Sequence, residues 1–367
     1  LGAPLPDGWL WDELTATISH PTTPVPVTTI SLSMRVYDSN GLWDEHEDVF
    51  SIAGPLWLGI GPLGVRPLLS NKTWSGVADI PVEPGSTVVR LAQRYGDLMV
   101  ASIETDSERK LSYSDYDDLA TWTLGQTLPV LSPGWRTSVS GTRLFNFGVM
   151  SNSVHFIESP SDLTWSSTEV ATAFGSSNVL QLCGDGVRVV CCNPLGQLWG
   201  STNNGDSFTN GTVLSGEDLF LTSSSVMDCN DGRFIIGGQD SDGIEDAGGA
   251  FYTDDVGATA TRCAFPDGVR SASPMQVSYC GSGRWLMAFG VKTGSTDSGL
   301  YMSINNGETF LPVGLPVNMD FTQQYAKSIA VNSGTGEVVI CGLEVGTATS
   351  RFFWSSDYIN WTEISTA

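Results

Sequence analysis

One short segment, at residues 300–310, recurs along this chain and constrains its fold more than any other feature. It reads as an aromatic strand, a polar turn containing Asn and Gly, and a Phe that opens the next strand. A unit of this size cannot bury both faces of its own small sheet, so many copies must stack side by side. The clearer copies lie at 198–208, 251–259 and 353–361, and the looser ones at 111–122 and 156–165.

A glycine that opens a tight hairpin recurs with the same period. Successive copies are separated by roughly 45 to 53 residues, the length of a four-stranded propeller blade. Charged residues make up only 16% of the chain, and no long run of helix-forming residues is visible. We therefore predict an all-β fold, a β-propeller of six or seven four-stranded blades. The turn glycines are Gly96, Gly141, Gly186, Gly232, Gly283 and Gly336.

The repeated segment resembles the Asp-box, or bacterial neuraminidase repeat, of sialidase-like β-propellers, which has the pattern Ser-x-Asp-x-Gly-x-Thr-Trp. The resemblance implies that the boxes sit at the periphery of the blades and have a structural role. Sialidases also carry an Arg-Ile-Pro motif near the N-terminus. Here the nearest match is Asp79-Ile80-Pro81, with Asp where Arg is required. The resemblance therefore covers the repeats and does not extend to the catalytic signature.

The chain divides into three parts. Residues 1–29 are rich in Pro and Thr and contain Trp9 and Trp11, which favours an extended arm that docks on other subunits of a larger assembly. A disordered terminus is the alternative. Residues 30–85 form either a divergent first blade, which we favour, or a small β module. The clear repeats occupy 86–367.

The charge of the chain excludes several kinds of partner. Forty acidic residues face seventeen basic ones, for a net charge of −23. Such a surface repels phosphate, so we expect neither nucleic acid nor anionic lipid as a partner. The longest apolar stretch, 53–69, is interrupted by Gly, Pro and Arg and is not expected to insert into a membrane.

The loops that face the central channel carry the candidate ligand-binding residues. In propellers these are the connections between the second and third strands of a blade and between one blade and the next. Trp135, Arg136 and Tyr325 fall in them. Aromatic rings stack on sugars and Arg forks onto carboxylates, which indicates glycan recognition. Ordinary packing at the start of a strand is the alternative.

One acidic loop is a candidate cation site. Asp240, Asp242, Glu245 and Asp246 offer carboxylate oxygens within a Gly-containing loop, as Ca²⁺ prefers. The spacing is not that of an EF-hand, and a solvated acidic loop is the alternative. No other cofactor is predicted.

The cysteines read as structural. Cys183, Cys229 and Cys280 occupy the same position in successive repeats, where we expect a small buried side chain. Equivalent positions on separate blades are expected to be too far apart for a disulfide. No Cys-x-x-Cys pair exists, and the three histidines have no metal-type spacing partner.

The sequence therefore favours a non-enzymatic binding and structural propeller that works in a virion or outside the cell. Degenerate Asp-box propellers of this composition resemble those of bacteriophage tails and other virion appendages, which implies attachment to a receptor or glycan. A glycoside hydrolase or lyase of sialidase-like fold is one alternative. A scaffold subunit that presents its loops to other proteins is the second.

Overall fold

The computed structural model describes seven strands between Leu10 and Asp79 and most residues from Ser86 to Ile364. Side chains are described from Arg94 onward, apart from the gaps and some strand residues beside them. Within 86–364 the description omits 106–108, 116–120, 130–135, 149–152, 170–178, 180, 194–195, 215–225, 239–248, 267–272, 291–298, 317–318, 321–327, 333–335 and 345–349.

Six antiparallel sheets of the same design follow one another from Ser86. In the first five, four strands pair in sequence order, as expected for chain segments joined by short turns. Blades 1 and 2 consist of β8 (Ser86–Tyr95), β9 (Leu98–Thr105), β10 (Arg109–Asp115), β11 (Thr123–Thr127), and of β12 (Arg136–Ser140), β13 (Arg143–Phe147), β14 (Ser153–Ser159), β15 (Asp162–Glu169).

Blades 3 to 5 repeat this order. Their strands are β16 (Gln181–Gly184), β17 (Val189–Cys192), β18 (Gln197–Ser201), β19 (Thr209–Val213); β20 (Val226–Asn230), β21 (Arg233–Gly238), β22 (Gly249–Thr253), β23 (Thr261–Arg262); and β24 (Ser273–Gly281), β25 (Arg284–Gly290), β26 (Gly299–Ser303), β27 (Leu311–Val313).

Blade 6 has the same four-stranded core and one additional short strand. Its β28 pairs with the far end of β30, beside the β29–β30 ladder. The strands are β28 (Met319–Asp320), β29 (Ser328–Asn332), β30 (Glu337–Glu344), β31 (Ser350–Ser355) and β32 (Thr362–Ile364).

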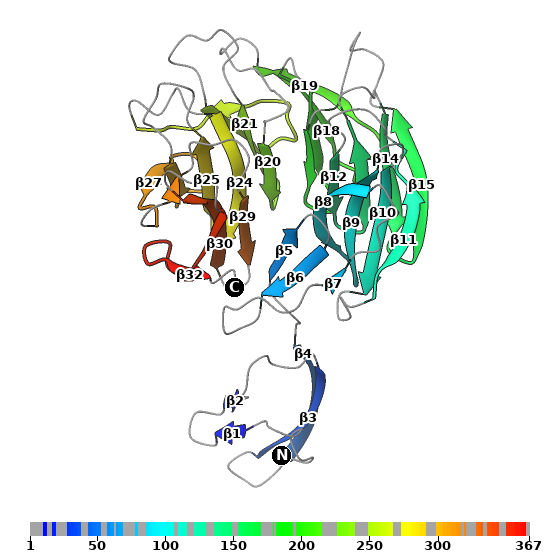
Figure 1. Cartoon of the computed structure of the whole chain (residues 1–367), viewed down its shortest axis with the longest axis vertical. Helices are drawn as coiled ribbons and strands as arrows, with labels where there is room; N and C mark the ends of the chain where they lie inside the picture. Colours follow the sequence, from blue (N-terminus) through cyan, green and yellow to red (C-terminus); the bar gives the residue numbers. More distant parts are fainter. Residues whose placement is uncertain are drawn as a thin grey trace.

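The first strands of neighbouring blades contact one another and line the centre of the molecule. β12 lies against β8 and β16, β20 lies against β16 and β24, and β24 lies against β29. Figure 1 shows the six blades arranged around this centre. The predicted all-β propeller with four-stranded blades is confirmed, with six such blades.

Three smaller sheets precede blade 1. A two-stranded β1–β2 pair and the long β3–β4 hairpin come first, and the three-stranded sheet β5–β6–β7 follows. β5 contacts β8, the inner strand of blade 1. The interpretation of 1–29 as a docking arm and of 30–85 as a first blade remains a prediction. The strands are β1 (Leu10–Asp12), β2 (Thr17–Ser19), β3 (Thr28–Tyr37), β4 (Trp43–Ile52), β5 (Trp57–Gly61), β6 (Gly64–Leu68) and β7 (Ala78–Asp79).

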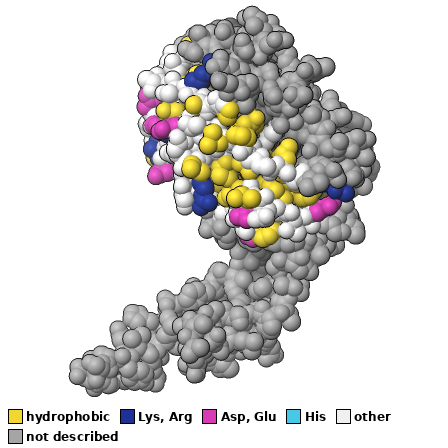
Figure 2. All heavy atoms as spheres, turned by 90° about the vertical axis from the view of Figure 1, so that its left-hand side faces the viewer, with side chains coloured by type: hydrophobic (Ala, Val, Ile, Leu, Met, Phe, Trp, Pro, Cys, Tyr) yellow, Lys and Arg dark blue, Asp and Glu magenta, His cyan; other side chains and the backbone are white. Residues whose placement is uncertain are grey.

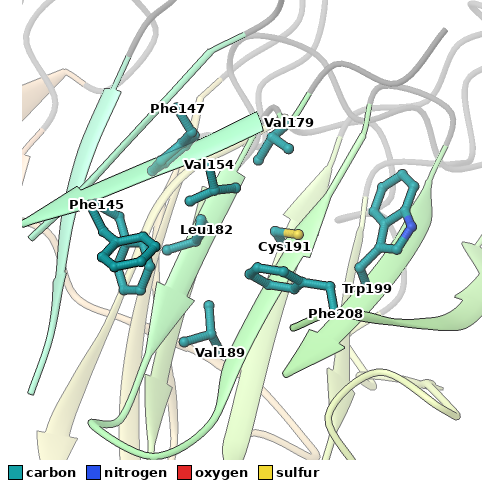
Figure 3. Packing of buried hydrophobic residues seen from close by; sticks show 10 residues of the cluster. Phe145, Phe147, Val154, Val179, Leu182, Val189, Cys191, Trp199 and Phe208 are labelled. Atoms are coloured by element: carbon teal, nitrogen blue, oxygen red, sulfur yellow. The ribbon is translucent and has the colours of Figure 1, made fainter. Parts of the chain in front are cut away.

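The hydrophobic core is divided into layers between adjacent blades. One layer joins blades 2 and 3 through Phe145, Val154, Leu182, Val189 and Trp199, all of them buried (Figure 3). Comparable clusters join blade 1 to 2, 3 to 4, 4 to 5 and 5 to 6. Because each blade covers the apolar face of its neighbour, these side chains become buried only when the blades stack. In the described part of the chain no helix is long and apolar enough to cross a membrane.

Candidate functional site: the two ends of the blades

The strand order gives every blade two different ends. At one end lie the turn between the first and second strands, which has two residues in blades 1, 2, 4 and 5, and the turn of the repeated segment between the third and fourth strands, here called the box turn. At the other end lie the connections between the second and third strands and those between blades. We call these the box end and the loop end.

By their positions in the sequence, the predicted ligand-binding and cation-binding residues fall in or next to the connections that define the loop end. Arg136 opens β12 and pairs with Phe147 across the β12–β13 ladder, but its side chain lies outside the described residues. Trp135 and Tyr325 lie outside them altogether, as does the acidic loop with Asp240, Asp242, Glu245 and Asp246. Their roles remain predictions. Elsewhere, in the part of the chain that the structure describes, no group of three or more His, Cys, Asp or Glu is arranged to hold a metal ion.

The box turns use their polar side chains on their own backbone. In blade 5, Ser303 Oγ accepts hydrogen bonds from the backbone N–H groups of Asn305 and Gly307, at 3.3 and 2.9 Å, and donates to Asn305 Oδ1 at 2.8 Å. Asn305 Oδ1 also accepts from Thr309 N at 3.0 Å. The polar residues of the turn therefore satisfy backbone donors that strand pairing leaves free.

The same arrangement recurs with different residues in other blades. In blade 4, Thr253 and Asp255 replace Ser303 and Asn305. Burial raises the pKa of Asp255, but hydrogen bonds from Thr259 and Thr253 outweigh this and leave the pKa below its usual value. In blade 6, hydrogen bonds donated by Asn360 and by Ile359 N lower the pKa of Asp357. These carboxylates are engaged in the fold, which matches the structural role predicted for the boxes.

Two buried arginines at the box end join adjacent blades. Arg143, at the start of β13 in blade 2, binds both carboxylate oxygens of Glu158 at 2.8 and 2.9 Å. It also donates to two residues of the blade 3 box turn, to Asn204 O at 2.6 Å and to Asp206 Oδ1 at 2.7 Å. Its guanidinium lies over the Phe156 ring, 4.4 Å from the centroid. Burial lowers the pKa of Arg143, but the carboxylates of Glu158 and Asp206 reverse the shift, so the side chain is held charged.

Arg233 makes the equivalent connection between blades 4 and 5. It binds Asp254 through two hydrogen bonds of 2.7 and 2.6 Å and donates to Asn306 O, in the next box turn, at 2.7 Å. Its guanidinium lies 4.1 Å from the centroid of the Tyr252 ring. We call each such arginine, with the box turn of the following blade, a blade latch.

The latch arginines were not predicted from the sequence, although a signal was present. An arginine stands at or just before the start of the second strand in blades 2 to 5, at Arg143, Arg188, Arg233 and Arg284. In a chain with only seventeen basic residues, four in one repeat position is an indication of a shared role.

The inner strands that line the centre are joined by side chains as well. Asp228, on β20, accepts a hydrogen bond from Tyr279 N on β24 at 2.7 Å. Gln276 on β24 donates to Ile329 O on β29 at 2.7 Å and accepts from Ile329 N at 3.0 Å. Burial raises the pKa of Asp228 to about 6, although backbone hydrogen bonds from Tyr279 and Cys229 oppose the shift.

The expectation that equivalent cysteines on separate blades are too far apart to bridge remains a prediction, although two of these cysteines lie at one seam. Cys183 on β16 belongs to a buried cluster against which Cys229 on β20 packs. The inner strands of blades 3 and 4 are in contact there, and Cys183 pairs with Val190 and Cys229 with Phe234, all within that cluster. Cys183 and Cys280 are buried as predicted, whereas Cys229 is half-buried, and all three are free thiols.

Of the three histidines, His155 lies within a blade. It lies on β14 between buried Val154 and Phe156, and is itself half-buried. Burial lowers its pKa, which favours the neutral imidazole.

Comparison with known proteins is limited to the fold. No family model and no curated protein matches the sequence. Among solved structures the chain is similar to the GH74 xyloglucanase of Xanthomonas campestris, at 12% identity and a TM-score of 0.49, over 73% of this chain and 43% of the xyloglucanase. It is also similar to YCF48 from Cyanidioschyzon merolae, at 13% identity and a TM-score of 0.48, over 77% of this chain and 86% of that one.

This chain is a β-propeller. Its six blades establish that by their own topology. It spans less than half of the xyloglucanase, and at such low identity neither similarity bears on a substrate or a partner.

Proposed function

We propose that this propeller is a non-enzymatic binding and structural module of a virion, such as a phage tail, and that it works outside the cytoplasm in attachment to a cell-surface glycan or receptor. The observation that carries the proposal is the difference between the two ends of the blades. At the box end the repeated polar and charged residues are engaged in turns and blade latches. The residues predicted to bind a ligand fall in or next to the connections of the loop end by their positions in the sequence.

The residue types assigned to the loop end suit a sugar. Trp135 and Tyr325 supply aromatic faces for stacking on a pyranose ring, and Arg136 supplies a planar fork for a carboxylate. A net charge of −23 disfavours nucleic acid and anionic membranes as the attachment target.

The latched architecture suits a load-bearing part. Each latch joins the second strand of one blade to the box turn of the next, so the ring resists separation of its blades. The Pro-rich segment 1–29, with Trp9 and Trp11, supplies the proposed anchor to other subunits. We propose no catalytic residue.

A glycan array combined with detection of released sugar tests the proposal. Binding without release supports it. Release of sugar would instead identify a hydrolase or lyase, and silence in both measurements would leave the scaffold function and overturn glycan attachment. Screening should cover both neutral and acidic glycans.

Matched variants test which end binds. Trp135→Ala and Tyr325→Ala are each expected to weaken glycan binding at least tenfold, since stacking on a ring contributes about 1–3 kcal/mol. Trp361→Ala is the control, because Trp361 lies at the box end and donates to Gly314 O. Unfolding midpoints of the three variants separate lost binding from lost folding. Equal binding by all three would contradict the assignment to the loop end.

A further inference from the structure

A thiol pair joins blades 3 and 4 at their inner strands. Cys183 is 6% exposed on β16, and Cys229 is half-buried on β20. Cys183 lies in a cluster with Val190 and Phe234, and Cys229 packs against the same cluster. Two thiols that share one cluster, on strands already in contact, need only a limited displacement to reach bonding distance.

The two thiols differ in access. Cys229 keeps part of its surface exposed, whereas burial, followed by the neighbouring Cys229, raises the pKa of the Cys183 thiol well above its usual value. The exposed thiol is therefore the one that an incoming reagent meets first. The buried Cys183 thiol is placed to react next with the mixed disulfide formed on Cys229, because both residues pack in the same seam.

The seam between blades 3 and 4 has a weaker arginine contact than the seams between blades 2 and 3 and between blades 4 and 5. The side chain of Arg188 remains 33% exposed and approaches Asp231 of blade 4 at 3.6 Å, without a described hydrogen bond to the blade 4 box turn. By contrast, Arg143 and Arg233 have side chains that are 10% exposed and donate directly into the next box turn. A covalent bond would therefore reinforce a seam whose ionic contact is weaker than at those two seams.

We propose that Cys183 and Cys229 form a disulfide that links blade 3 covalently to blade 4 when the folded protein reacts with a small-molecule disulfide as oxidant. The Cys229 thiolate attacks one sulfur of the oxidant and releases one small thiol, giving a mixed disulfide. The Cys183 thiolate then attacks Cys229 Sγ and releases the second small thiol. Two protein thiols are oxidised, and the oxidant is reduced to two thiols that take up the two protons.

The experiment uses the full chain and glutathione disulfide as the probe. After native oxidation and denaturation, the titratable thiols are expected to fall from seven to five per chain. The intact mass falls by about 2 Da, and a cross-linked peptide containing Cys183 and Cys229 appears. The unfolding midpoint should rise by roughly 5 °C, because the bond closes the loop 183–229.

Serine variants provide the controls. Cys229→Ser should keep all six remaining thiols after oxidation, and its unfolding midpoint should not rise. Cys280→Ser, at the same position one blade on, should still lose two thiols. Seven thiols after oxidation of the native protein, a stable mixed disulfide on Cys229, or a cross-linked peptide joining Cys183 to Cys192 would each overturn the proposal. The peptide map of the oxidised wild-type protein tests for the Cys183–Cys229 disulfide even if a variant fails to fold.

Discussion

At the scale of single residues, Asp228 shows what an inner strand demands of a charged side chain. Its carboxylate accepts hydrogen bonds from Tyr279 N at 2.7 Å and from Cys229 N at 2.9 Å. These bonds join two blades, but burial still opposes the charge and raises the pKa to about 6. The carboxylate therefore helps to hold the two blades in register, but its ionisation lowers the free energy of unfolding.

We predict that Asp228 makes the protein less stable as the pH rises from about 4 to about 6. The folded state holds the Asp228 proton over this range and the unfolded state does not, so ionisation favours unfolding. Asp228→Asn should remove this contribution. The free energy of unfolding of the variant relative to the native protein should increase with pH by at most about 3 kcal/mol.

Urea denaturation of both proteins from pH 4 to pH 7 measures this difference. Comparing the two proteins at each pH cancels the titration of the other carboxylates. A difference that stays constant over the range would show that Asp228 is ionised at its ordinary pKa.

A glycine of the box turn gives a second prediction. Gly205 has φ +91°, and a Cβ there would lie 2.8 Å from the Phe145 ring of the preceding blade. Gly205→Ala should therefore destabilise the protein by about 2–4 kcal/mol through backbone strain and overpacking. Gly314→Ala is the matched control, since a Cβ at Gly314 meets nothing within 4 Å and should change stability by less than about 1 kcal/mol. Thermal unfolding checks both, and equal midpoints would refute the close approach of box and blade.

At the scale of elements, the box turn is a fastener between blades. Its polar side chains stabilise the turn through hydrogen bonds to the backbone. The turn then presents a backbone carbonyl, Asn204 O or Asn306 O, to an arginine of the preceding blade. The residue at this position is in the left-handed region, with φ of 51° and 58° for the two asparagines. Asn tolerates that conformation better than most residues, which explains its use there.

We predict that the two buried latches matter more than the exposed one. Arg143→Ala and Arg233→Ala should each destabilise the ring by about 2–4 kcal/mol, because carboxylates and a part-buried carbonyl lose their donor and an aromatic ring loses its cover. Arg188→Ala should cost about 1 kcal/mol or less, since its side chain is 33% exposed. Chemical denaturation of the three variants checks the order. A cost for Arg188 equal to that for Arg143 would contradict the latch description.

Hydrophobic side chains also reach the surface of the outer blades. Ile304 and Ile359, in the box turns of blades 5 and 6, are 74% and 76% exposed, and Leu311 on β27 is 56% exposed. Figure 2 shows hydrophobic side chains gathered on the side of the molecule that carries these blades. Nothing among the described residues shows what covers them.

At the scale of the whole molecule, the net charge of −23 sets how ions act on the fold. Like charges repel within the compact state, so added salt should stabilise the protein in general. A specific Ca²⁺ site in the loop containing Asp240, Asp242, Glu245 and Asp246 would add to that general effect. The two contributions are separable because screening depends only on ionic strength.

We predict that Ca²⁺ at millimolar concentration raises the unfolding midpoint above that in NaCl of equal ionic strength. At ten times the dissociation constant the gain is about 1.4 kcal/mol. The variant with Asp240→Asn, Asp242→Asn, Glu245→Gln and Asp246→Asn should lose the difference and keep the response to NaCl. Mg²⁺ serves as the control ion, since it favours stricter octahedral coordination. Identical midpoints in CaCl₂ and matched NaCl would leave the loop as a solvated acidic segment.

Much of this architecture follows from the sequence alone. The recurrence of the box at 198–208, 300–310 and 353–361, with turn glycines in step, is sufficient to predict four-stranded blades, because periodicity acts through local turn chemistry and side-by-side burial. The burial of Cys183 and Cys280 follows from the same repeat. The sequence also indicates that the boxes are structural.

Only the tertiary structure decided which residues meet across the seams. The contacts of Arg143 with Asn204, and of Cys183 with Cys229, join positions roughly one blade or more apart, so no local pattern contains them. They arise because the blades converge at the centre and because each box turn packs on the strand of its neighbour. Local sequence determines the blade, whereas the closing of the ring determines the partners of each side chain.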